Sequence, residues 1–103
     1  MTTRGENAAT PIVKGGWLYT DAASVQLDTP AWIAWLKGHT TFYLEAPEGT
    51  FTARQEKRWD GQFWYAYRRH QGKLHKAYLG KAEDITKERL LSVASKLTAK
   101  AGA

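Results

Sequence analysis

Apolar and polar side chains alternate along residues 41–79, which is the pattern of short, half-buried strands separated by turns. We expect strands over 42–45, 51–59, 62–70 and 73–79, and residues 16–19 can add a short extended segment. The dipeptides Asp60-Gly61 and Gln71-Gly72 separate the last three segments, and the first is a strong signal for a two-residue hairpin turn. The pattern therefore predicts antiparallel strands joined by tight turns.

Apolar positions three and four residues apart predict an amphipathic helix near 86–99. Thr86 is expected to cap its N-terminus, and Ile85 and Leu90 have the spacing of a hydrophobic staple. The stripe of this helix consists of Leu90, Val93, Ala94 and Leu97. An apolar stripe must be buried, so we expect the helix to pack on one face of the sheet.

A shorter helix of about two turns is predicted over 30–37, because Thr29 suits the cap, Pro30 the first position and Gly38 the end. The tryptophans of this part of the chain have two interpretations. They either extend the core at the end of the sheet or form an apolar patch for a protein partner or a second copy. These tryptophans are Trp17, Trp32 and Trp35.

These elements predict an α+β fold: a three- to four-stranded antiparallel sheet packed on a C-terminal helix, with a short N-terminal helix. The chain of 103 residues suits one domain with a small core. Residues 1–15 are polar and contain breakers, so we expect a flexible tail there and a single sheet-plus-helix domain over 16–103.

If both tight turns contain two residues, the register of the hairpins follows. Across the first hairpin, the expected pairs are Glu56 with Tyr65 and Arg54 with Tyr67. Across the second, they are Tyr65 with Tyr78 and Tyr67 with Lys76.

Because side chains alternate along a strand, the two faces of this sheet differ. One is apolar with a small central row, and is expected to receive the C-terminal helix; it carries Phe51, Ala53, Trp64, Ala66, Ala77 and Leu79. The other mixes aromatic rings with basic side chains; it carries Thr52, Arg54, Glu56, Arg58, Phe63, Tyr65, Tyr67, Arg69, Leu74, Lys76 and Tyr78. An antiparallel sheet needs only one buried face, so the second is free to bind a ligand.

The charge of the chain indicates a polyanionic ligand. The formal net charge is +5, and residues 51–81 alone hold eight Lys or Arg against two acidic residues. A concentrated basic field attracts polyanions, and an antiparallel ribbon fits the major groove of DNA. We expect sequence-specific binding of double-stranded DNA, in transcription regulation or recombination, with Arg54 and Arg58 reading bases. The expected contact residues are Thr52, Arg54, Glu56, Arg58, Tyr65, Tyr67, Arg69, Lys73, Lys76 and Tyr78.

Two other interpretations of this face stay open. The tyrosines can be cross-strand pairs that only stabilise the sheet, each by about 0.2–1 kcal/mol, beside solvated arginines. Alternatively, single-stranded DNA or RNA can stack on the tyrosines, at about 1–3 kcal/mol per base. The deciding feature is whether the rings lie open or are held between cationic side chains.

No catalytic residue, metal site or cofactor is predicted. His70 and His75 flank one hairpin but have no third metal ligand near them in the sequence. The carboxylate pairs lie at a turn, as Glu45 and Glu48 do, or just before a helix, not in a predicted cleft. The lack of cysteine fits a reducing compartment, and no apolar run approaches the roughly 20 residues of a membrane span. We therefore expect a cytoplasmic protein without a membrane partner.

Part of the chain resembles known DNA-binding domains. The run Gly61–Arg69, followed by Tyr78–Gly80 and by a helix starting at Thr86, resembles the three-strand-plus-helix domain of plant ethylene-response factors and the arm-binding domains of phage-type integrases. In those families the sheet enters the major groove. The resemblance implies that the DNA-facing residues are Arg54, Arg58, Tyr65, Tyr67, Arg69 and Lys76.

A closer similarity covers about residues 30–98. The segments Pro30–Trp32, Phe51–Arg54 and Tyr65–Arg69 are similar to the N-terminal segment of some large LuxR-type bacterial regulators. This similarity implies a bacterial protein that takes part in transcription regulation.

Overall fold

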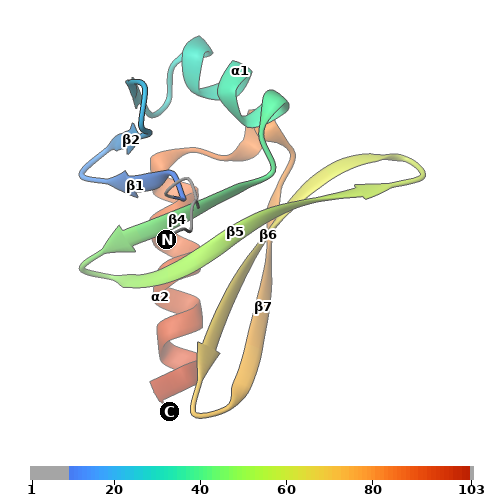
Figure 1. The fold of residues 1–103 in the computed structure, drawn as a ribbon. Helices are drawn as coiled ribbons and strands as arrows, with labels where there is room; N and C mark the ends of the chain where they lie inside the picture. The colour runs from blue at the N-terminus through green and yellow to red at the C-terminus, as the bar shows by residue number, and fades with distance from the viewer. Residues whose placement is uncertain (1–9, 103) are drawn as a thin grey trace, which may run out of the picture.

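The computed structural model describes residues 10–102, and the side chains of residues 10–99. Seven strands form one sheet in the order β3-β2-β1-β4-β5-β6-β7 (Figure 1). They are β1 (Ile12–Lys14), β2 (Trp17–Tyr19), β3 (Ser24–Gln26), β4 (Thr41–Ala46), β5 (Gly49–Arg58), β6 (Gly61–His70) and β7 (Lys73–Gly80). The helices are α1 (Pro30–Gly38), the short 3-10 helix η1 (Ala82–Asp84) and α2 (Lys87–Gly102).

The predicted sheet of three to four antiparallel strands is wrong in the number and direction of its strands. The four predicted strands correspond to β4–β7, and β1, β2 and β3 add three more. β1 runs parallel to β4, with Val13 opposite Leu44, so the sheet is mixed. Strand β2 corresponds to the extended segment expected over 16–19, whereas β1 and β3 have three residues each, too few for an alternating pattern to identify them. The α+β class itself agrees with the structure.

The tail predicted over residues 1–15 includes β1. Val13 is buried against Leu18 of β2 and Leu44 of β4, so the domain extends to residues before 16. Residues 1–9 of the predicted tail lie outside the described residues.

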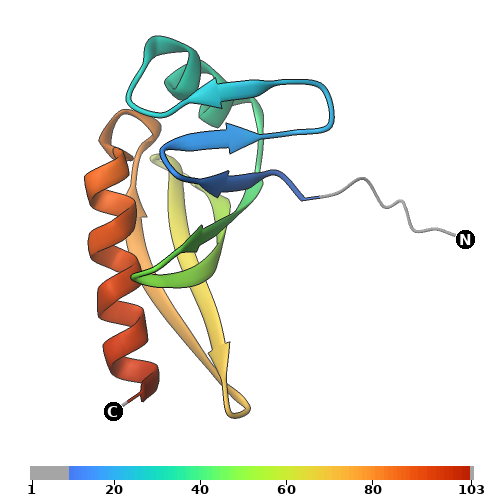
Figure 2. The ribbon, with the colours of Figure 1, turned by 90° about the vertical axis from the view of Figure 1, so that its left-hand side faces the viewer.

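Helix α2 packs across one face of the sheet, as predicted (Figure 2). All four residues of its predicted stripe are buried, as are Ala53 and Ala66 of the small row beneath it, and Ala77 is half-buried. Thr86 caps the helix, since its Oγ1 accepts a hydrogen bond from the Arg89 amide at 3.1 Å. The small central row allows the helix to approach the strands closely.

Helix α1 lies on the same side of the sheet and closes the end of the core. Its Trp32 is fully buried, donates its indole N–H to the carbonyl of Ile85 at 2.7 Å, and meets Phe42 edge-on at 5.5 Å between centroids. Trp35 stacks on Trp32 at 5.9 Å and is half-buried. These two tryptophans therefore extend the core, whereas Trp17 lies on the opposite face of the sheet, so the three do not form one patch.

The helices described between residues 10 and 102 are α1, η1 and α2. None of them is both long enough and apolar enough to cross a bilayer.

Candidate nucleic-acid interface

The β6–β7 hairpin has the predicted register. Tyr65 lies opposite Tyr78, and Tyr67 lies opposite Lys76. Its turn is formed by Gln71 and Gly72, which have φ angles of 51° and 81°. Positive φ at both central residues is the geometry of a type I′ turn, whose twist matches that of the strands.

The β5–β6 hairpin differs from its predicted register by two residues. Arg54 lies opposite Tyr65, and Arg58 opposite Gly61, because Trp59 and Asp60 form the turn in place of Asp60 and Gly61. Asp60 does not adopt the positive φ that the predicted turn requires, and Gly61 instead begins β6 with a φ of 147°. A shift of two residues keeps every side chain on its predicted face, because the period of a strand is two.

The face of β5–β7 opposite α2 is covered by no helix among the described residues (Figure 2). We call it the open face. It carries Thr52, Arg54, Glu56 and Arg58 from β5, Phe63, Tyr65, Tyr67 and Arg69 from β6, and Leu74, Lys76 and Tyr78 from β7. Nine of the ten predicted contact residues lie there. The exception is Lys73, which opposes His70 and shares the α2 side of the strand with Ala77 and Leu79.

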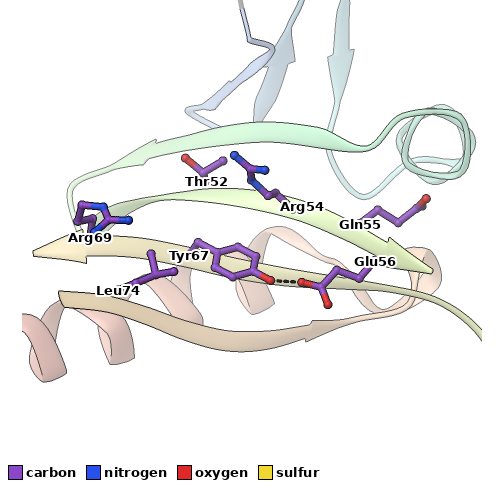
Figure 3. A pocket seen from close by; sticks show the side chains of 7 residues that line it. All are labelled: Thr52, Arg54, Gln55, Glu56, Tyr67, Arg69 and Leu74. Atoms are coloured by element: carbon purple, nitrogen blue, oxygen red, sulfur yellow. Dashed lines mark hydrogen bonds between the residues drawn. The ribbon is translucent and has the colours of Figure 1, made fainter. Parts of the chain in front are cut away.

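Glu56 of β5 interacts with several neighbouring side chains of the open face. Its carboxylate accepts a hydrogen bond from the hydroxyl of Tyr67 (Figure 3). Arg58 donates to Oε1 at 2.9 Å, and the ammonium of Lys76 lies 3.5 Å from Oε2. One carboxylate thus holds two cations and one phenol in fixed positions.

The ring of Tyr65 is in contact with two cationic side chains. The Lys76 ammonium lies 4.3 Å and the Arg58 guanidinium carbon 5.3 Å from the ring centroid. Tyr78 meets the same ring edge-on at 5.5 Å, and Arg58 also donates to the Tyr65 hydroxyl at 3.3 Å. The ring does not lie open: arginine and lysine occupy the surface that a stacking base would need.

Arg54 and Arg69 are the two cations of the open face whose guanidinium groups remain available. Both are exposed, and neither makes a hydrogen bond or ion pair with the residues that the structure describes. They border one depression, together with Thr52, Gln55, Glu56, Tyr67 and Leu74 (Figure 3). Arg68, which precedes Arg69 on β6, instead points to the other side of the sheet and donates to the carbonyl and hydroxyl of Thr50 at 2.9 and 3.0 Å.

Two parts of this surface were not predicted from the sequence. On one side, the same face continues over β4, β1 and β2, through the half-buried Tyr43 and the exposed Ile12, Trp17 and Tyr19. At the other end, Trp59 occupies the tip of the β5–β6 hairpin with 97% of its surface exposed. The turn signal at Asp60-Gly61 placed Trp59 inside a strand, so only a correct turn assignment would have moved it to the tip.

No family model, curated protein or solved structure matches the chain. The resemblances drawn from the sequence motifs therefore stay predictions. Within the described residues, no group of three or more His, Asp or Glu side chains is arranged to hold a metal ion.

Proposed function

We propose that this protein binds double-stranded DNA by laying the open face into the major groove. The observation that carries the proposal is the gathering of four basic side chains and three tyrosines on one uncovered face of a twisted sheet. Antiparallel ribbons are narrow enough to enter the major groove, and cations on them neutralise phosphates along its edges.

The contacts on the open face support a division of roles among its cations. Arg54 and Arg69 have uncommitted guanidinium groups, which suit bidentate hydrogen bonds to the O6 and N7 atoms of guanine. Arg58 and Lys76 are held by Glu56 and Tyr65, so they suit phosphate contacts at fixed positions. Arg69 thus replaces Arg58 as the second candidate for base reading.

Single-stranded DNA or RNA is the second candidate ligand. The observation in its favour is that Tyr78 and Leu74 are exposed at the edge strand β7, where a base can stack. Against it, the Tyr65 ring already carries the Lys76 ammonium on one side. The duplex is therefore the preferred ligand, and we propose that the protein acts in the cytoplasm in transcription regulation or recombination.

Selection from random pools tests this proposal. The purified protein is incubated with a pool of random duplexes and, separately, with a pool of random single strands, each at two salt concentrations. We expect enrichment of duplexes and, for two to four phosphate contacts, a slope of about −2 to −4 in log K against log salt. Stronger enrichment of single strands would favour the second candidate. Failure to retain either polymer at low salt would refute both.

A further inference from the structure

The end of the β5–β6 hairpin projects beyond the rest of the sheet (Figure 1). Pairing of β5 with β4 ends at Arg54, and pairing of β6 with β7 ends at Trp64. β5 and β6 continue to pair with each other as far as Arg58 and Gly61. Residues 56–63 therefore form a two-stranded arm with no further strand beside it among the described residues.

The tip of this arm carries an indole that the fold does not use. Trp59 is 97% exposed, whereas Trp17, the next most exposed tryptophan, is 39% exposed and the others are buried or half-buried. Burial of a large aromatic side chain in an apolar environment is favourable, but the described residues bury almost none of Trp59.

The tip is continuous with the open face. Trp59 borders a depression that is also lined by Arg58, Phe63, Tyr65 and Tyr78, all of which belong to that face. Lys57 and Arg58 precede it on β5, and the Lys81 ammonium lies 5.8 Å from the ring of Phe63. Basic side chains thus lie along the arm, and Asp60 is the acidic side chain at its tip.

The length of the arm corresponds to a distance in DNA. Trp59, the first residue after β5, follows Arg54 by five residues, which is about 17 Å at about 3.4 Å per residue. Half a turn of B-DNA also measures about 17 Å, so the tip reaches the neighbouring minor groove if β5 runs along the DNA axis from an open face centred on the major groove. Apolar wedges act there by entering between base pairs and unstacking them.

We propose that Trp59 is such a wedge and stacks on a base of the same DNA that the open face binds. The inference rests on the proposed function and adds a preference to it: deformable or interrupted duplexes are bound more tightly than stiff, fully paired ones. Unstacking costs least at a mismatched or unpaired base, so an interruption in the duplex exposes the effect most clearly.

The test uses two duplexes of about three helical turns that share one mixed sequence and differ only by a single unpaired base at the centre. We expect the unaltered protein to bind the interrupted duplex about 10-fold more tightly, because stacking on one base is worth that much. Trp59→Ala removes this preference, Trp59→Phe retains most of it, and Gln62→Ala, an exposed change on the same arm, leaves it unaltered. The fluorescence of Trp59 is obtained as the difference between the emission of the unaltered protein and that of Trp59→Phe. We expect iodide to quench this fluorescence less when the interrupted duplex is added.

The outcomes separate this inference from the proposed function. If the unaltered protein and Trp59→Ala bind both duplexes equally well, the wedge is refuted and duplex binding stands. If the unaltered protein binds neither duplex, the proposed function fails and the wedge fails with it. If Trp59→Ala instead converts a dimer into a monomer in sedimentation, Trp59 is a contact between copies and the wedge is refuted.

Discussion

Glu56 is the one acidic side chain on the open face, and its removal gives the sharpest test of how that face works. Glu56→Gln keeps the size of the side chain and an oxygen that accepts from the Tyr67 hydroxyl. It removes the negative charge beside Arg58 and Lys76. If the face binds phosphates, this substitution strengthens binding although it deletes two ion pairs.

The structure sets the size of both effects. The side chains of Glu56, Arg58 and Lys76 are 30%, 46% and 42% exposed, so their ion pairs are partly solvated. Pairs of this kind contribute about 0–1 kcal/mol each, so the free energy of unfolding falls by no more than about 1–2 kcal/mol. A carboxylate about 8 Å from a phosphate repels it by about 0.5 kcal/mol in water and about 2 kcal/mol at a protein surface. An intermediate value near 1 kcal/mol corresponds to a Kd about 5-fold lower.

Fluorescence anisotropy with a labelled duplex of random sequence measures this change. We expect Glu56→Gln to bind more tightly at low salt and to lose the advantage as salt rises. Glu45→Gln is the matched control, because Glu45 is paired with Lys14 at 3.4 Å on the same side of the sheet but belongs to β4, outside the open face. A folded Glu56→Gln protein that binds the random duplex more weakly would refute the reasoning and would indicate that Glu56 itself contacts bases.

Three further predictions concern single substitutions. Arg54→Ala is expected to cost about 1–3 kcal/mol on a selected site and less on random duplexes, while Lys76→Ala weakens both alike; equal losses for Arg54→Ala would contradict base reading. Gly49→Ala is expected to lower the free energy of unfolding in urea by about 1–3 kcal/mol, because its Cβ would lie 2.9 Å from a carbonyl oxygen of α2 and the backbone there has a φ of +150°. An unchanged midpoint of urea unfolding would exclude that close approach. Trp32→Phe leaves the Ile85 carbonyl without its hydrogen-bond donor, so we expect the free energy of unfolding, measured by thermal unfolding, to fall by about 1–3 kcal/mol while duplex binding is retained. Loss of binding by a folded variant would contradict the separation of core and interface.

Local sequence signals predicted the β5–β7 part of the sheet well. The Gln71-Gly72 turn and the cap at Thr86 depend on a few adjacent residues, and both form as expected. The error in the β5–β6 turn changed which residues are neighbours, so that Arg54 meets Tyr65 and not Tyr67. It did not change the side of the sheet on which each side chain lies, so the predicted interface residues of β5 and β6 still share one face.

The contacts that make up the candidate site were less predictable. Alternation placed Glu56 and Arg58 on the same face, but only the cross-strand geometry brings both of them to Tyr65 and Tyr67. Lys73 was expected at the interface for its charge, and the strand alternation places it on the side of α2.

The sequence alone determined which residues are apolar, where the longer strands turn, and which side of them is basic, because these properties depend on neighbours within a few positions. Tertiary structure decided the rest: the parallel pairing of β1 with β4, the burial of Trp32 beneath Ile85, and the exposure of Trp59. Each of these depends on segments that are distant in the chain, or on how far the β5–β6 hairpin extends beyond the neighbouring strands β4 and β7. A pattern within one segment carries no information on the partner that covers it or leaves it uncovered.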